Sequence, residues 1–309
     1  MKLLVLIGLL VFSVQGQALS KKVKNDKVRL LAEHKWHAGS RICWWDRAPA
    51  IEVYRYDPVT YILRQNKCGH YEAPFMYLLF GDETLFIQDT GALSAEQDFP
   101  LFDTVWEIVQ EVAAQQGKSP DDYKLLVTHS HSHGDHVAAD AQFIGKPNVS
   151  MIKPELSAIQ KAFGYGEGQL QWPQDNAQID LGGRQLTLFP IPGHHADAVA
   201  IYDPHTSWLL TGDSLYPGRL YVKDWQAFKT SIARLWQFAK STEISAVMGT
   251  HIEMSKEAGE DYKMGSTYQP NEAPLPLSKS DLSRLFELLQ TLDAPTQVVE
   301  DKFILYPLK

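Results

Sequence analysis

Hydrophobic and polar positions alternate over several short stretches of the chain, and this pattern predicts β-strands. Residues 51–56 and 60–64 flank the turn signal Asp57-Pro58, and residues 75–80 and 84–88 flank the polar stretch 81–83. Both arrangements are typical of β-hairpins. Further short strands are expected at residues 124–128, 149–152, 185–189, 198–202, 207–211 and 246–248.

Longer segments show apolar residues at helical spacing. Helices are expected at residues 101–115, 154–163, 225–238 and 280–292. Asp224 is a candidate N-terminal cap for the helix that begins at Trp225. Residues 19–37 are charged and lack a strong periodicity, so they are interpreted as an irregular lead into the domain. Strand-rich halves with intervening helices indicate an α+β fold in which two sheets pack together and helices cover them.

Composition narrows the class of protein. The chain has 309 residues, 44% of them hydrophobic, with 37 acidic and 29 basic side chains and a net charge of −8. This length supports one large core, so residues 19–309 are expected to form a single domain. No basic stripe is present to neutralise phosphates, which argues against a nucleic-acid partner.

The first residues resemble a secretory signal peptide. Met1-Lys2 precedes an apolar run from Leu3 to Val14, and small residues follow at Gly16 and Ala18. The run is shorter than the roughly 20 residues of a membrane-spanning helix. Residues 1–18 are therefore predicted to be a cleaved signal peptide, with a secreted or periplasmic protein and no stable membrane insertion afterwards. A buried N-terminal helix is the alternative, but the run does not alternate polar and apolar faces.

If the protein is exported, its two cysteines can form a disulfide. Cys43 and Cys68 are the only cysteines of the chain, and an isolated pair in an oxidising compartment can form a disulfide. We predict this bridge. Two free thiols remain the alternative, because the sequence does not show how closely their Cα atoms approach.

The most informative segment follows the strand expected at residues 124–128. It reads Thr-His-Ser-His-Ser-His-Gly-Asp-His over residues 128–136. Histidine and carboxylate side chains are ligands that zinc and similar divalent ions prefer. Two registers are possible, because His129 also starts a His-x-His-x-His run. The register that ends at Asp135-His136 is favoured, since it uses the aspartate and places Gly134 where the backbone turns sharply.

Three further candidate ligands each follow a predicted strand. His194 lies in Pro192-Gly193-His194, Asp213 in Thr211-Gly212-Asp213, and His251 in Gly249-Thr250-His251. Active sites are commonly built from such strand ends on a rigid scaffold. Four segments therefore offer seven candidate ligands at one edge of the sheets: His131, His133, Asp135, His136, His194, Asp213 and His251.

These residues together resemble the metallo-β-lactamase superfamily. Residues 131–136 look like its His-x-His-x-Asp-His signature, and the later ligands occur in the same order. The resemblance implies a four-layer αββα sandwich with a dinuclear metal site. It assigns His131, His133 and His194 to the first ion, assigns Asp135, His136 and His251 to the second, and makes Asp213 the bridge. Asp89 resembles the aspartate that ends an early strand in this family and supports the ligand loop without binding the metal itself.

The resemblance implies a metal-dependent hydrolase for a small-molecule substrate. Zinc is the default for the two divalent ions, and iron or manganese remains an alternative. A water shared by two ions would ionise near neutral pH and attack an ester, thioester, lactone or related carbonyl. Asp135 and Asp213 are the candidate catalytic carboxylates, because their charges partly offset those of two dications.

An aspartate in the bridging position, here Asp213, resembles the glyoxalase II and lactonase branch of the superfamily. Glyoxalase II itself fits poorly, because export would remove the chain from cytosolic glutathione thioesters. Two alternatives stay open: a β-lactamase of the third metallo subclass, and an enzyme similar to persulfide dioxygenases, which bind one iron through two histidines and an aspartate. The oligomeric state is not predicted.

Several residues near these motifs have two interpretations. Aromatic side chains around the first hairpin either line a groove or pack the hairpin against the sandwich: Trp44, Trp45, Tyr54, Tyr56 and Tyr61. The residues that closely follow Asp213 are candidate pocket residues: Tyr216, Arg219 and Tyr221. His195 is expected to orient a ligand from outside, and His129 is expected to lie outside the metal site.

Overall fold

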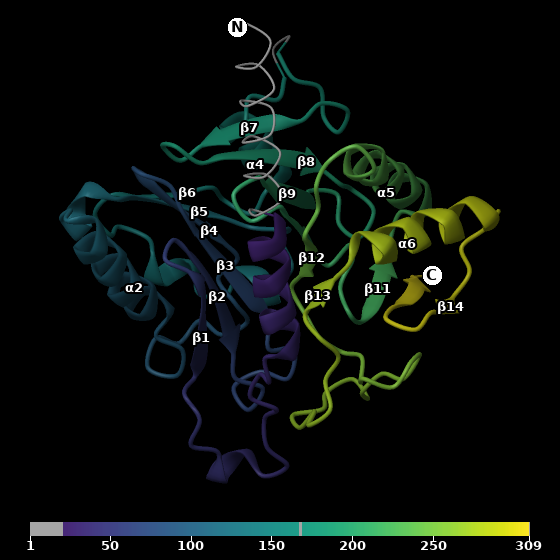
Figure 1. Cartoon of the computed structure of the whole chain (residues 1–309), viewed down its shortest axis with the longest axis horizontal. Coiled ribbons are helices and arrows are strands. Elements are labelled where there is room, and N and C mark those ends of the chain that lie inside the picture. The colour runs from purple at the N-terminus through teal and green to yellow at the C-terminus, as the bar shows by residue number, and fades with distance from the viewer. Residues whose placement is uncertain (1–20, 167–168, 309) are drawn as a thin grey trace, which may run out of the picture.

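Two six-stranded β-sheets pack face to face in the computed structural model, which describes residues 21–166 and 169–308 (Figure 1). The signal peptide predicted for residues 1–18 lies outside the described residues. One long helix covers the outer face of the first sheet, and two cover the outer face of the second. This is the four-layer αββα arrangement that the sequence predicted.

The first sheet is built in sequence order from the N-terminal half of the chain. Its strands are β1 (Ile51–Asp57), β2 (Thr60–Gln65), β3 (Phe75–Phe80), β4 (Thr84–Gln88), β5 (Lys124–Thr128) and β6 (Val149–Met151). The predicted hairpins are confirmed, since β1 pairs with β2 and β3 pairs with β4 in antiparallel fashion. Strands β4, β5 and β6 run parallel, so the ends of β4 and β5 meet at one edge.

The second sheet has the order β13-β12-β10-β9-β8-β7. These strands are Pro276–Leu277, Ala246–Gly249, Trp208–Gly212, Val199–Asp203, Gln185–Pro190 and Ala177–Asp180, respectively. A small third sheet joins β11 (Arg219–Val222), β15 (Ile304–Pro307) and β14 (Val298–Val299). Strands β7, β11, β13, β14 and β15 were not predicted from the sequence.

The four predicted helices are present within a few residues of the predicted bounds, as α2 (Leu101–Gln116), α4 (Leu156–Ala162), α5 (Trp225–Ala239) and α6 (Lys279–Thr291). The short helix α3 (Gly134–Val137) and the 3-10 turns η1 (Cys43–Trp45), η2 (Pro120–Asp122) and η3 (Asp140–Gln142) were not predicted. Asp224 caps α5 as expected, because its side chain accepts a hydrogen bond from Ala227 N. None of the described helices is long and apolar enough to cross a membrane.

Strand β3 shows why the two sheets need cover on both faces. Phe75, Tyr77 and Leu79 point into the core between the sheets, whereas the alternate residues Met76 and Leu78 pack under α2. Side chains of a strand alternate between its faces, so a strand that is apolar throughout must be buried on both sides. The same alternation places Trp208 and Leu210 of β10 between the sheets.

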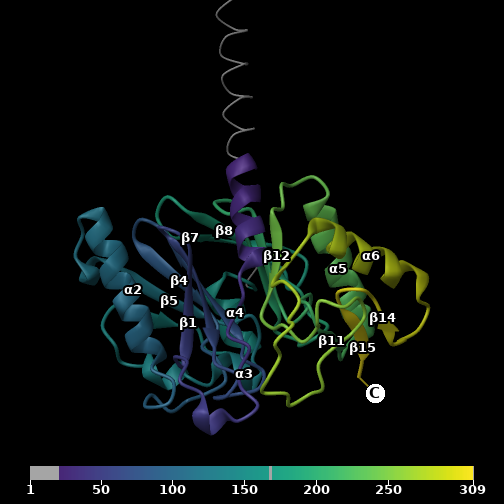
Figure 2. The same ribbon diagram turned by 60° about the horizontal axis from the view of Figure 1, so that its bottom comes forward.

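Residues 21–33 form a helix, so the prediction of an irregular lead was wrong. The helix crosses the edge of the two sheets, where it is drawn in purple in Figures 1 and 2. Leu31 is fully buried in the core between the sheets and Val28 packs beside it. Lys24 Nζ also donates a hydrogen bond to Ser207 Oγ, at 2.8 Å. Tertiary contacts therefore stabilise a helix whose own apolar face is too narrow to show a periodicity.

One buried arginine ties the two sheets together. Arg184, just before β8, forms a bidentate ion pair with Asp203 at 2.6 and 3.1 Å. Its guanidinium also donates to the carbonyl oxygens of Val59, in the turn between β1 and β2, and of Phe80, at the end of β3, at 2.9 and 3.1 Å. Arg184 is 5% exposed, so these bonds fix the sheets in a region that water does not reach.

The structure joins Cys43 and Cys68 in a disulfide, with Cα atoms 5.1 Å apart. The predicted bridge is therefore present. It attaches the turn η1 to the segment that follows β2, and this segment continues to Tyr71 and Glu72.

Candidate metal centre

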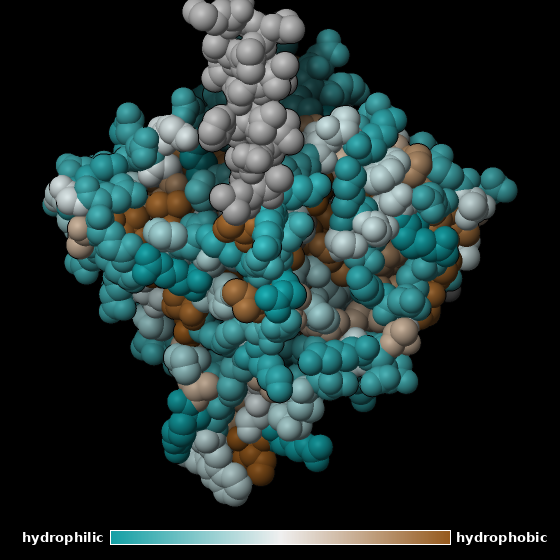
Figure 3. Space-filling model, in the orientation of Figure 1, coloured by the Kyte–Doolittle hydropathy of each residue, from teal (hydrophilic) through white to brown (hydrophobic). Residues whose placement is uncertain are grey.

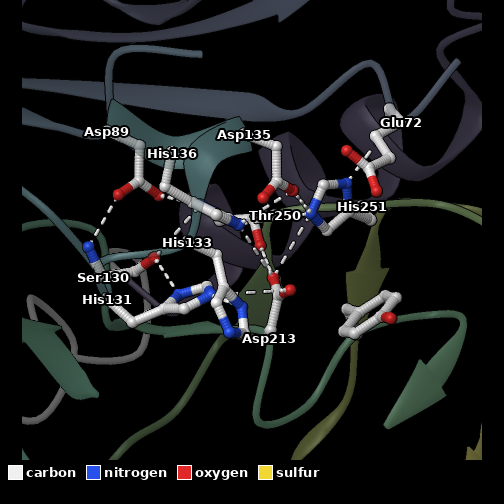
Figure 4. A network of polar contacts seen from close by, with 12 residues as sticks. Glu72, Asp89, Ser130, His131, His133, Asp135, His136, Asp213, Thr250 and His251 are labelled. Atoms are coloured by element: carbon white, nitrogen blue, oxygen red, sulfur yellow. Dashed lines mark hydrogen bonds and ion pairs between the residues drawn. The ribbon is translucent and has the colours of Figure 1, made fainter. Parts of the chain in front are cut away.

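The candidate ligands converge where the two sheets meet, as Figure 4 shows for all of them except His194. The loop after β5 and the short helix α3 carry four ligands from the first sheet. The second sheet supplies His194 after β8, Asp213 after β10 and His251 after β12. All seven predicted ligands lie in two groups, and in each group the ligand atoms are within 4.8 Å of one another: His131, His133 and His194, and Asp135, His136, Asp213 and His251.

The first group consists of three imidazoles. His131 Nε2, His133 Nδ1 and His194 Nε2 are separated by 2.8, 3.0 and 3.2 Å. A circle through atoms at these separations has a radius of about 1.7 Å, smaller than the usual Zn–N distance of about 2.0–2.1 Å. The three nitrogens could therefore all bind one zinc ion at a normal bonding distance.

The second group is mixed. Five distances among Asp135 Oδ2, His136 Nε2, Asp213 Oδ1 and His251 Nε2 lie between 3.2 and 3.5 Å. The centre of a regular tetrahedron with edges of about 3.3 Å lies about 2.0 Å from its corners, which matches zinc bound to nitrogen and carboxylate oxygen. The donor set and its spacing therefore fit a second divalent ion.

Asp213 faces both groups. Its Oδ1 atom lies 3.5 Å from His136 Nε2, whereas its Oδ2 atom lies 3.9 Å from His131 Nε2 and 3.7 Å from His194 Nε2. Thr250 Oγ1 donates a short hydrogen bond to Oδ1, which holds the carboxylate in this orientation. One carboxylate with an oxygen toward each group has the placement expected of a bridging ligand.

Hydrogen bonds at the opposite ring nitrogens orient the imidazoles. His194 Nδ1 lies 2.7 Å from the carbonyl oxygen of Tyr221, and His251 Nδ1 lies 3.2 Å from that of Glu72. His136 Nδ1 lies 3.1 Å from Asp89 Oδ2. An acceptor at one ring nitrogen fixes the proton there and leaves the other nitrogen free to bind a metal.

Asp89 also acts on the ligand loop, as the resemblance implied. Its second carboxylate oxygen accepts a hydrogen bond from Ser130 N at 2.6 Å. The residue follows β4 and is fully buried. It has a positive φ of 70°, a conformation that short polar residues tolerate best. Asp89 thus connects the end of β4 to the start of the ligand loop after β5.

The two groups differ in charge. Burial and the neighbouring imidazoles hold the pKa of His131 well below its usual value, and burial lowers the pKa of His133 to about 4. These rings are therefore neutral ligands at pH 7. Burial also opposes charge on His251, but Asp213 and Asp135 outweigh it and raise its pKa to about 9. The carboxylates thus create a local field that favours positive charge.

Two other histidines lie outside both groups, as expected. His129 Nε2 bonds to Asp140 Oδ1 at 2.8 Å, which supports the register chosen from the sequence. His195 Nδ1 lies 2.5 Å from Asp197 Oδ1, and its ring centroid lies 4.9 Å from that of His133. His195 therefore packs against a candidate ligand.

Both groups open into a pocket of about 190 Å³. Tyr71 and Glu72 line it, and sequence analysis missed them because no motif marks them. Tyr216, Arg219 and Tyr221 also line it, as predicted. The Arg219 guanidinium is already occupied, at 2.9 Å from Glu253 and 2.6 Å from Asp261, so it holds the pocket wall together instead of offering a free charge.

The fold and these two groups define an αββα protein with a candidate dinuclear metal centre. The sequence profile of the metallo-beta-lactamase superfamily matches residues 72–299, which include every candidate ligand. The chain therefore belongs to the metallo-beta-lactamase superfamily.

Known relatives agree with the glyoxalase II branch. The chain is 30% identical to a hydroxyacylglutathione hydrolase of Edwardsiella ictaluri over 121 residues, which is 38% of this chain and 44% of that protein. It is 25% identical to one of a Synechococcus species over 173 residues, 55% of this chain and 61% of that protein. The chain thus spans about half the length of these relatives. The solved structure of TMB-1 shares the fold at 14% identity, with a TM-score of 0.50, covering 79% of this chain and 99% of that one.

Proposed function

We propose that this protein is a dinuclear metal-dependent hydrolase that acts on an ester, thioester, lactone or related carbonyl substrate. The orientation of Asp213 is the observation that carries the proposal, because its two oxygens face two separate ligand groups. Relatives named hydroxyacylglutathione hydrolases support an acyl substrate.

Two divalent ions bound here would supply an activated water and would stabilise negative charge on a carbonyl oxygen. The side chains do the rest. His131, His133 and His194 present neutral nitrogens, and Asp135 and Asp213 stay ionised, since neighbouring imidazoles outweigh burial and hold the pKa of both carboxyls well below their usual range. Asp135 also lines the pocket, where an ionised carboxylate can accept a hydrogen bond from the attacking water and orient it.

The ligand inventory favours this function over the alternatives. A site that binds one iron through two histidines and an aspartate would leave four of the seven ligands without a role. Zinc is the proposed metal because the donors are nitrogen and oxygen at near-tetrahedral spacing. The disulfide Cys43–Cys68 supports export to an oxidising compartment, either secretion or the periplasm.

Metal analysis and substrate turnover on one purified sample test the proposal. We expect close to two divalent ions per chain, and turnover of at least one member of a panel of thioesters, lactones, β-lactams and phosphodiesters. Chelation should abolish the activity and added zinc should restore it. One ion or none after gentle purification would contradict the dinuclear centre, and iron with oxygen consumption on a persulfide would favour the dioxygenase. Turnover of β-lactams alone would indicate a β-lactamase.

A further inference from the structure

The disulfide-linked turn η1 exposes an unusual amount of apolar surface. Ile42, Trp44 and Trp45 are 50%, 84% and 69% exposed. In Figures 1 and 3 the turn protrudes from the lower end of the molecule, where hydrophobic surface reaches solvent. Exposed single apolar residues are common, but a contiguous cluster of large ones marks an interaction site. The alternative from the sequence, that these tryptophans pack against the sandwich, is wrong.

Covalent and hydrogen bonds hold the turn in this conformation. Cys43, between Ile42 and Trp44, is bonded to Cys68. Trp45 N donates to the carbonyl oxygen of Ile42 at 3.0 Å. The turn is therefore preorganised with its apolar side chains outward, and binding would cost little conformational entropy.

Positive charge flanks the exposed tryptophans. Arg41 and Arg47 lie on either side of the pair, and both are exposed. Arg47 Nη1 donates to the carbonyl oxygens of Trp44 and Asp46, at 3.3 and 3.2 Å, which keeps the guanidinium beside the indoles. Asp46 lies between the two arginines, but its carboxylate is 11% exposed and faces His37 and Asn66, so the exposed charge of the turn is positive in a chain whose net charge is −8.

The turn lies beside the mouth of the metal pocket. Ser40 N donates to the carbonyl oxygen of Thr267 at 3.0 Å, and Gly39 pairs with Tyr268 in an isolated bridge. The segment that carries Thr267 also supplies Lys263 and Met264 to the pocket wall, and Met264 is 59% exposed. Figure 2 shows this yellow-green segment next to the purple turn. The cationic and apolar residues thus continue to the pocket mouth.

We propose that this turn docks onto a lipid bilayer that contains anionic headgroups, with Trp44 and Trp45 inserted at the interface. Indole rings favour the boundary between headgroups and acyl chains, and adjacent arginines pair with lipid phosphates. The three apolar side chains expose on the order of 450 Å², well below the roughly 800 Å² per partner of a stable protein interface. A protruding tip of this size suits a soft lipid surface better than a second protein. Docking places the pocket mouth at the membrane surface, within reach of amphiphilic substrates.

Vesicle sedimentation of the full chain tests the docking. The variants are W44S/W45S, R41Q/R47Q and, as a matched control, I144S, which removes an apolar side chain of 69% exposure in another part of the structure. On vesicles of phosphatidylcholine with phosphatidylglycerol, W44S/W45S should bind at least about tenfold more weakly than the wild type, and I144S should bind equally well. R41Q/R47Q should lose about as much on these vesicles, but little on phosphatidylcholine alone.

All variants share residues 1–20, so differences among them report on the turn. Melting temperatures and thiol labelling show that each variant is folded and oxidised. Brominated phosphatidylcholine should quench wild-type tryptophan fluorescence more than that of W44F/W45F, which keeps apolar rings at the tip. Unchanged vesicle binding of W44S/W45S, an equal loss in I144S, or equal quenching in W44F/W45F would overturn the proposal. None of these results depends on metal content or hydrolysis.

Discussion

Replacing Asp89 with asparagine should weaken one metal site and spare the other. Both carboxylate oxygens of Asp89 are used, one by Ser130 N at 2.6 Å and the other by His136 Nδ1 at 3.1 Å. An amide has a single acceptor oxygen, so the variant must lose one of these two bonds. Ser130 N can only donate, so the amide oxygen is expected to face it. The amide nitrogen then faces His136 Nδ1, and His136 loses the acceptor that fixes its ring proton.

The expected loss of metal affinity follows from the role of Asp89, which binds no metal itself but orients a candidate ligand. Removing such a partner of a metal-binding histidine typically lowers affinity about 10–100-fold, or about 1.4–2.7 kcal/mol. The loss should fall on the group that contains His136. His194 takes its orientation from the carbonyl oxygen of Tyr221, which the substitution leaves in place.

Asp140→Asn is a matched control in the same region. Asp140 Oδ1 accepts hydrogen bonds from both His129 Nε2 and Thr90 Oγ1, at 2.8 and 2.7 Å. An asparagine oxygen can keep both bonds, and His129 lies outside the metal groups. This variant should therefore bind metal like the wild type.

Competition with a chromophoric chelator measures both sites on metal-free protein. We expect two zinc affinities in the wild type and in Asp140→Asn, and one weakened affinity in Asp89→Asn. Wild-type affinities in Asp89→Asn, or an equal loss in Asp140→Asn, would refute the orienting role of Asp89.

Three further predictions concern the bridge, the sheet packing and the disulfide. Asp213→Ala should lose bound metal and should lower turnover by more than the 10–100-fold that is typical when a hydrogen-bond partner of a metal ligand is removed. His129→Ala should keep both ions, although the loss of its buried hydrogen bond should lower the free energy of unfolding by about 1–3 kcal/mol. The reverse result in metal analysis would disprove the chosen register. Arg184→Met leaves a buried carboxylate unpaired and should lower the free energy of unfolding in urea by about 3–5 kcal/mol, and a loss below 1 kcal/mol would exclude its role between the sheets. Thiol labelling of the denatured, unreduced protein should find no free thiol at Cys43 or Cys68. Reduction of the disulfide should lower the free energy of unfolding by on the order of 3 kcal/mol, since the bridge spans 25 residues.

The sequence predicted which candidate ligands the fold brings together, because each of them lies in a recognisable position of the sequence. His194, Asp213 and His251 directly follow strands whose apolar runs are visible in the sequence, and strand ends of one sheet meet at one edge. The layers were predictable for a related reason, since strands that are apolar on both faces require cover on both sides.

Other parts of the centre leave no trace in the residue types. Tyr221 and Glu72 orient His194 and His251 through backbone carbonyls, which every residue has. Arg219 was correctly predicted to line the pocket. Its ion-pair partners Glu253 and Asp261 lie more than 30 positions away in sequence, so the sequence could not show that its charge is paired. The helix at residues 21–33 was missed because contacts such as Leu31 with the core, not periodicity, stabilise it.

The candidate ligands are divided between the two sheets, so we expect metal binding to be coupled to sheet packing. The first sheet brings His131 and His136 to the centre, and the second brings His194 and Asp213, so each ligand group includes residues from both. A relative shift of the sheets would change the spacing within both groups at once. Arg184 resists such a shift at the buried end of β8, whose other end leads to His194. Bound metal should therefore stabilise the sandwich as a whole, because ions that bind only the packed arrangement shift the unfolding equilibrium toward it.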